Sequence, residues 1–127
     1  MSHQEPYARL SIADDQPYLI CHVTRLPTLR EYRGMLIEIA QAGAHNKLSR
    51  VLFDVRSMTS NYRTIAAQSY GEVIADELRG RFRVAMLVNE MYPDRRHLET
   101  VAVNRGLRLK YFTDRDQALV WLLGATA

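Results

Sequence analysis

Residues 50–56, RVLFDVR, are apolar at every position between the two arginines except Asp54. A run of the same kind, RVAMLV, occupies residues 83–88. Short apolar runs bounded by charged residues are typical of strands near the middle of a sheet. The segment from about 63 to 78 between them has apolar residues at helical spacing, with Gly80 after its end. A strand, a helix and a second strand in this order predict two parallel strands.

Outward from this centre, strand-like and helix-like patterns alternate along the chain. A turn at residues 14–17 separates two alternating runs and predicts an N-terminal hairpin. Thr28 and Glu31 have the spacing of a capping box, and Asp94 and Thr113 are placed to cap the last two helices. This order predicts an α/β fold: a five-stranded mixed sheet with an N-terminal hairpin and parallel later strands. The expected strands are 7–13, 18–24, 50–56, 81–89 and 107–112, and the expected helices are about 28–43, 63–78, 94–105 and 113–122.

The outer strands have one polar face. In residues 107–112, Leu109 and Tyr111 alternate with Arg108 and Lys110. Such alternation is typical of a strand covered on one side only, and right-handed connections between sequential strands place their helices on the same side. We therefore expect helices mainly on one face, and an uncovered apolar centre with a charged rim on the other. Such a surface favours self-association, so a homodimer is expected.

The composition is that of an ordinary globular chain, with 47% hydrophobic and 24% charged residues among 127. This length predicts a single domain over residues 1–127. The net charge of +3 comes from arginines spread between Arg9 and Arg115, which does not favour nucleic-acid binding. No apolar run approaches the ~20 residues of a membrane span, and the N-terminus does not resemble a signal peptide. Cys21 is the single cysteine, so no internal disulfide can form. This fits a reducing compartment, and a cytoplasmic protein is expected.

The end of the chain has a distinctive spacing. The pattern F-x-D-x-x-x-A-x-x-W-L runs from Phe112 to Leu122. Together with the strands at 51–56 and 83–88, this pattern resembles the SpoIIAA-like family, also described as STAS-like or STAS/SEC14-like domains. The resemblance extends from about Leu10 to Leu122.

The resemblance implies a right-handed β-α superhelix and a bacterial protein. It also implies relatives that are anti-sigma-factor antagonists, cytoplasmic parts of anion transporters, or lipid-binding modules. The antagonists have an Asp-Ser-Ser-Gly-like phosphorylation motif at the start of the helix after the third strand. Here residues 61–65, NYRTI, occupy that place, with Thr64 near the phosphoacceptor position but no neighbouring glycine. The phosphorylation switch of those relatives is therefore not expected.

Two polar loops follow the third and fourth strands, at the edge where open α/β sheets bind ligands. A helix N-terminus there offers backbone N–H groups to an anion, and arginines in a first helical turn oppose the helix dipole and favour an anionic partner. The alternative for both loops is an ordinary hydrophilic connection whose caps and carboxylates satisfy the polar groups. The candidate binding residues are Arg56, Ser57, Ser60, Arg63 and Thr64 in the first loop, and Asn89, Tyr92 and Arg95 in the second.

Catalytic and metal-binding patterns are missing from the sequence. The four histidines do not have metal-ligand spacing, and Cys21 has no second cysteine. Asp54 could be a general base, but no nucleophile is paired with it, so a carboxylate held by an arginine or by backbone N–H groups is favoured. No metal, no cofactor and no enzymatic activity are expected.

Two functions remain open. The first is a non-enzymatic STAS-like regulatory or protein-interaction module. The alternative is a small-ligand or lipid-binding module with a cavity between helices and sheet. The expected partners are a second copy of the chain, another protein, or a small anionic or lipid ligand, without nucleic acid and without a membrane span. The expected cavity lining is Leu36, Ile39, Ile65, Tyr70 and Val73.

Overall fold

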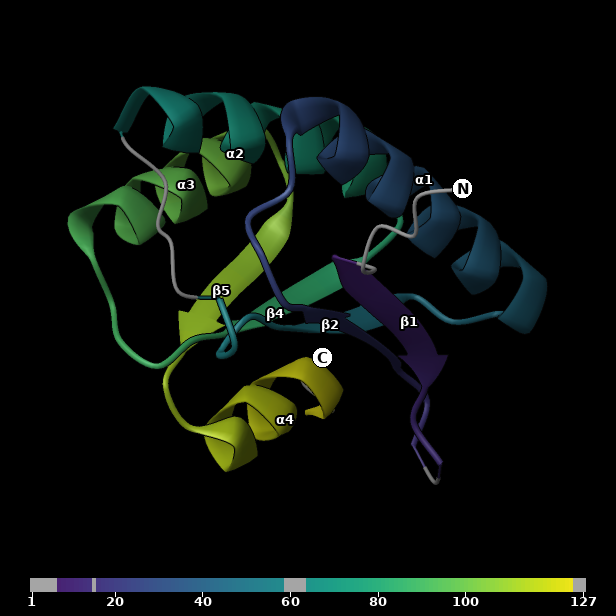
Figure 1. The fold of residues 1–127 in the computed structure, drawn as a ribbon. Coiled ribbons are helices and arrows are strands. Elements are labelled where there is room, and N and C mark those ends of the chain that lie inside the picture. The colour runs from purple at the N-terminus through teal and green to yellow at the C-terminus, as the bar shows by residue number, and fades with distance from the viewer. Residues whose placement is uncertain (1–6, 15, 59–63, 125–127) are drawn as a thin grey trace, which may run out of the picture.

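A computed structural model describes residues 7–14, 16–58 and 64–124, except for the side chains of Thr64 and Ile65 (Figure 1). The described residues form one five-stranded sheet in the order β1-β2-β3-β4-β5. β1 pairs antiparallel with β2, and each later pair is parallel. The predicted mixed sheet with an N-terminal hairpin is therefore confirmed. The strands are β1 (Ala8–Ile12), β2 (Leu19–Val23), β3 (Arg50–Asp54), β4 (Arg83–Leu87) and β5 (Arg108–Phe112).

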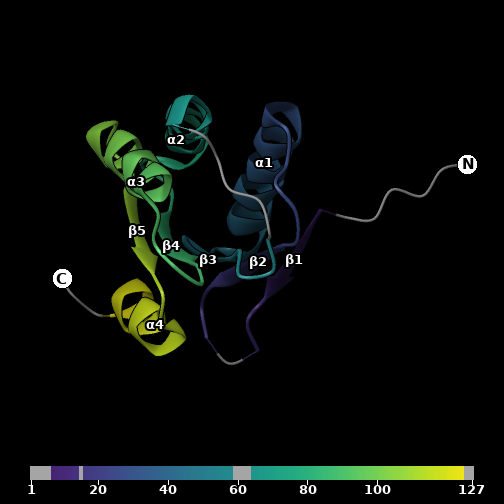
Figure 2. The same cartoon turned by 60° about the vertical axis from the view of Figure 1, so that its left-hand side comes forward.

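The helices lie on both faces of this sheet, but unequally. α1, α2 and α3 form a layer on one face, and α4 lies alone on the other (Figures 1 and 2). The expectation that helices lie mainly on one face is confirmed. The helices are α1 (Leu29–Asn46), α2 (Thr64–Leu78), α3 (Pro93–Asn104) and α4 (Arg115–Leu123).

The N-terminus of α1 has the predicted capping box. Thr28 Oγ1 accepts a hydrogen bond from the Glu31 N–H at 3.1 Å, and the Glu31 carboxylate accepts one from the Thr28 N–H at 2.9 Å. Arg25 donates two further hydrogen bonds to this carboxylate, at 3.0 and 2.8 Å. The hydrogen bond from Arg25, with that from the Thr28 backbone, lowers the pKa of Glu31 to about 2. A charge-assisted network therefore fixes the start of the first helix.

The N-caps of α3 and α4 differ from the predicted ones. α3 begins after Tyr92 with Pro93 at its start, and Asp94 lies within the first turn. Proline fits there because the N–H groups of the first turn have no partner inside the helix. The cap of α4 is Asp114 rather than Thr113, because the Asp114 carboxylate accepts hydrogen bonds from two backbone N–H groups of the first turn.

The larger core lies between the sheet and the layer of three helices. Phe53 of β3 is buried there with Leu36 of α1, Ile74 of α2 and Leu98 of α3. α2 and α3 approach each other closely at Gly71, where an added Cβ would stand 3.0 Å from the backbone oxygen of Leu98. The missing side chain at this position therefore lets the two helices pack.

A smaller core lies on the opposite face and includes residues of α4. Figure 2 shows α4 on this face. The expectation that the apolar centre of this face is uncovered is therefore wrong. The right-handed rule fixes the side of a helix that joins two parallel strands, but α4 follows the last described strand and joins it to none. Charged residues border this centre, since Arg50 and Arg83 lie two positions before Leu52 and Ala85 and so on the same face of the sheet. The core residues, none more than 3% exposed, are Tyr18, Leu52, Ala85, Leu87, Ala118 and Leu122.

Candidate functional site

The ends of β2, β3 and β4 bring polar side chains from three chain segments together at one edge of the sheet. In the parallel register of β2 and β3, His22 lies opposite Asp54. Arg56 and Ser57 follow β3, and Asn89 follows β4. We call these five residues the carboxyl edge. Parallel strands end on the same side of a sheet, so the predicted convergence of the two loops follows from the topology.

Asp54 and Arg56 form a two-pronged ion pair at the carboxyl edge. Arg56 Nε lies 3.0 Å from Asp54 Oδ1, and Arg56 Nη2 lies 2.9 Å from Asp54 Oδ2. Burial is the largest influence on the Asp54 carboxyl and would raise its pKa. The hydrogen bonds and charge of Arg56, with a smaller effect of His22, together outweigh burial and lower the pKa of Asp54. Asp54 is therefore an ionised anchor for Arg56, as the arginine-held alternative predicts.

His22 contacts Ser57 and approaches Asp54. His22 Nε2 is 3.2 Å from Ser57 Oγ, and His22 Nδ1 is 4.0 Å from Asp54 Oδ2. A serine, a histidine and an aspartate in this order occur in hydrolase triads, but the histidine of a triad is hydrogen-bonded to its carboxylate. A separation of 4.0 Å is too long for that bond, and both Asp54 oxygens accept hydrogen bonds from Arg56. The arrangement therefore does not orient His22 as a base for Ser57.

Sequence reasoning missed His22 as a member of this edge. His22 and Ser57 are 35 residues apart in the sequence, and no motif joins them. The feature of the sequence that could have revealed His22 was the expected parallel pairing of the second and third strands. This pairing places a polar residue at the end of β2 beside Asp54.

The loop between β4 and α3 is fixed by its own polar groups. Asn89 Nδ2 donates a hydrogen bond to the backbone oxygen of Arg56 at 2.7 Å, which ties this loop to the first one. Arg95 is 5% exposed and donates a hydrogen bond to the backbone oxygen of Glu90. Its guanidinium carbon lies 4.7 Å from the centroid of the Tyr92 ring. Arg95 therefore supports the loop from within, whereas Tyr92, 36% exposed, faces solvent.

The structure separates the predicted site residues into three groups. Arg56, Ser57 and Asn89 meet at the carboxyl edge, and Tyr92 and Arg95 contact each other in the adjoining loop. Ser60 and Arg63 lie outside the described residues, and Thr64 begins α2 with a side chain that is also outside them.

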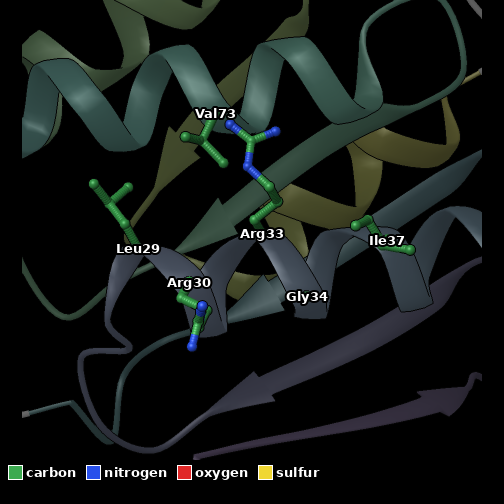
Figure 3. A pocket seen from close by; sticks show the side chains of 6 residues that line it. All are labelled: Leu29, Arg30, Arg33, Gly34, Ile37 and Val73. Carbon is green, nitrogen blue, oxygen red and sulfur yellow. The ribbon is translucent and has the colours of Figure 1, made fainter.

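Four of the five residues expected to line a cavity between helices and sheet are described, Ile65 being the exception, and one of them, Ile39, lines a hollow of about 160 Å³ between α1 and the N-terminal hairpin. Leu36, Ile39, Tyr70 and Val73 belong to the larger core and are at most 9% exposed. Tyr70 also donates a hydrogen bond to the backbone oxygen of Pro27. A hollow of about 480 Å³ lies on the outer side of the helix layer, where α1 and α2 meet (Figure 3). Its lining is Leu29, Arg30, Arg33, Gly34, Ile37 and Val73.

The described residues form neither a metal-binding cluster nor a membrane-spanning helix. Within residues 7–14, 16–58 and 64–124, no group of three or more histidine, cysteine, aspartate or glutamate residues could hold a metal ion. Among the helices of these same ranges, none has the length and apolar character needed to cross a membrane.

Two solved structures have similar folds. An uncharacterized protein of the DUF3478 family with a SpoIIAA-like fold, from Shewanella loihica PV-4, matches with a TM-score of 0.58 and 20% identity, over 96% of this chain and 98% of that one. An anti-sigma factor antagonist from Mycobacterium paratuberculosis matches with a TM-score of 0.54 and 10% identity, over 91% of this chain and 93% of that one. No family model and no curated protein matches the sequence. Both likenesses concern the fold, and together with the observed strand order they show that the chain has the SpoIIAA-like fold implied by its sequence resemblance.

Proposed function

We propose that this chain is a non-enzymatic regulatory module that binds another protein through the carboxyl edge and Tyr92. A protein of the same fold is an anti-sigma factor antagonist, a name that describes action on another protein. We place this role in the bacterial cytoplasm, which agrees with the single, buried cysteine Cys21.

The observation that supports this proposal is the internal bracing of the described residues at the carboxyl edge and in the loop after β4. Arg56 is held by Asp54, Asn89 is bonded to the backbone of Arg56, and Arg95 supports Tyr92. A surface that is already ordered loses less conformational entropy when a partner docks. Tyrosine is also among the residue types that contribute most to protein interfaces. These braced residues are therefore suited to binding another protein.

The same contacts argue against a catalytic role for this edge. A nucleophilic serine needs a base that is oriented by a third group. Ser57 has a histidine neighbour, but that histidine lacks a hydrogen bond to Asp54. The small-ligand alternative has less support, because the four described residues expected to line its cavity belong to the larger core. The hollow that Ile39 lines is about 160 Å³, smaller than the roughly 300 Å³ at which ligand pockets begin.

Site-specific photo-crosslinking tests the proposal. Benzoylphenylalanine replaces Tyr92 in living cells, and Arg81, an exposed residue just before β4 at the opposite end of the sheet, is the control position. We expect position 92 to give one major adduct with another protein, and position 81 to lack this adduct. The crosslinked protein, once identified and purified, should bind the unmodified chain. The predicted homodimer would appear in the same experiment as an adduct of the chain with itself.

Two substitutions then test which contacts matter. Arg56→Ala removes the side chain held by Asp54, and Asn89→Ala removes the bond between the loops. Each should weaken binding of the identified partner by at least about tenfold, with unchanged circular dichroism. The proposal is refuted if position 92 gives no specific adduct, or if both variants bind the partner as tightly as the unmodified chain.

A further inference from the structure

Three arginines lie side by side across the sheet, on the face that α4 covers in part. Arg50 of β3 is paired with Arg83 of β4, and Arg83 is paired with Arg108 of β5. We call these three residues the arginine row. Neighbouring strands are about 4.8 Å apart, so three positive side chains leave the sheet within about 10 Å. Like charges that face each other across strands destabilise a sheet.

The arginine row has no internal counterion in the part of the chain that the structure describes. In that part of the chain no carboxylate oxygen lies within 4.0 Å of a guanidinium nitrogen of these three arginines. Such a partner is present for Arg25, Arg33, Arg56, Arg96 and Arg105. Arg83 Nε is buried and has no hydrogen-bond partner among the described atoms. Burial, followed by the charges of Arg108 and Arg50, lowers the pKa of Arg83. The row therefore has unused hydrogen-bond donors and an excess of positive charge.

An apolar hollow adjoins the arginine row along α4. Its volume is about 490 Å³, within the range of small-molecule sites. Trp121 and Phe112 form its aromatic wall, with ring centroids 5.6 Å apart, and Val120 beside them is 73% exposed. The guanidinium carbon of Arg83 lies 4.2 Å from the Trp121 centroid, which joins the row to the hollow. The lining is Arg83, Lys110, Phe112, Asp116, Gln117, Val120, Trp121 and Gly124.

Protection of a sheet edge explains only part of this pattern. Charged side chains on an edge strand prevent pairing with other chains, and β5 is an edge strand. Arg108 and Lys110 fit that role. Arg50 and Arg83 do not, because β3 and β4 are interior strands whose edges are already paired.

We propose that the arginine row and the adjoining hollow bind a soluble organic oxyanion, a phosphate or carboxylate group attached to an apolar body. The planar guanidinium groups suit the geometry of such a head group, and the aromatic wall suits the apolar body. The hollow is also lined by one carboxylate, Asp116, which repels an anionic head group, and by one further cation, Lys110, which attracts it.

Tryptophan fluorescence measures this binding directly, because Trp121 is the single tryptophan of the chain. The probe is hexyl phosphate, with inorganic phosphate and 1-hexanol as probes for the head and the body alone. We expect a saturable change with hexyl phosphate, at least about tenfold weaker binding of either part alone, and weaker binding at high salt. Absence of a saturable change with hexyl phosphate would overturn the proposal.

Matched charge variants locate the site. Arg83→Gln and Arg50→Gln should each weaken hexyl phosphate binding by at least about tenfold. Arg50 is outside the hollow lining, so Arg50→Gln keeps the proposal testable if Arg83→Gln disturbs the packing of Trp121. Arg96→Gln removes the same charge from α3, where the side chain is 67% exposed, and should leave binding unchanged. If all three variants weakened hexyl phosphate binding equally, only the net charge of the chain would matter, and the proposed site would be refuted.

A vesicle experiment separates a soluble ligand from a lipid surface. The chain is sedimented with phosphatidylcholine vesicles that contain or lack phosphatidic acid. Binding of hexyl phosphate without sedimentation supports the proposal, whereas binding confined to phosphatidic acid vesicles overturns it in favour of a membrane surface. This site and the carboxyl edge use different residues, so failure of either proposal leaves the other intact.

Discussion

Replacing Leu122 with alanine should lower the free energy of unfolding by about 3 kcal/mol. Leu122 is fully buried in the smaller core between α4 and the sheet. Leucine-to-alanine changes at buried positions cost about 2.7–5.0 kcal/mol, and the cost rises with the cavity that remains. We expect a value near the lower limit because the hollow beside Trp121 lets neighbouring side chains move into the vacated space.

Urea unfolding followed by two signals measures this effect. Trp121 fluorescence reports the environment of α4, and far-UV circular dichroism reports all the helices. Both transitions should shift to lower urea in Leu122→Ala, and thermal unfolding should shift down by about 10 °C. Val120→Ala is the matched control, because this side chain is on the same helix but 73% exposed, and its substitution should change the free energy by less than about 0.5 kcal/mol.

A loss below about 1 kcal/mol for Leu122→Ala, or equal losses for the two variants, would mean that α4 is not packed on the sheet as described. The apolar centre of this face would then be open, and the self-association expected from the sequence would regain its physical basis.

Three further predictions concern the larger core and the start of α1. Gly43→Ala should destabilise the chain by roughly 2 kcal/mol in thermal unfolding, because the new Cβ would overlap the Phe82 ring and stand 2.7 Å from the Leu48 backbone oxygen; an unchanged midpoint would contradict this. The Glu31 pKa is lowered from 4.5 to about 2, so its ionised form stabilises the fold above pH 4.5 and this contribution is lost as the pH falls toward about 2. Unfolding curves of the unmodified chain and Glu31→Gln should therefore converge on acidification, and a constant gap would argue against the network. Burial raises the pKa of Cys21 to about 12, so iodoacetamide should label it only after unfolding, and rapid native labelling seen by mass spectrometry would contradict its burial.

The strands and helices could be predicted because their signals are local. The alternation in residues 107–112 and the Thr28 capping box can each be recognised within a few residues of sequence. The side taken by α4 could not be predicted in this way. Ala118 and Leu122 form a short apolar face that could pack on either side of the sheet, and the side is decided by contacts with distant strand residues such as Leu52.

The predicted topology indicates where the candidate site lies, but it does not predict the contacts between the side chains of the site. Arg56, Ser57 and Asn89 converge because the strands they follow are parallel. The turn of Arg56 back to Asp54 and the burial of Arg95 depend on side-chain packing, which no local pattern encodes. The arginine row depends on strand register, since a shift by one residue moves a side chain to the other face.

Each described strand of the sheet neighbours the one that precedes it in the chain, and no later strand is inserted between earlier ones. During synthesis every new β-α unit can therefore join an edge that already exists. Neighbouring units also close short loops, which favours rapid folding. The face that α4 covers is completed last. Its apolar centre stays exposed until the ribosome has made α4, and during this interval the nascent chain is most in need of a chaperone.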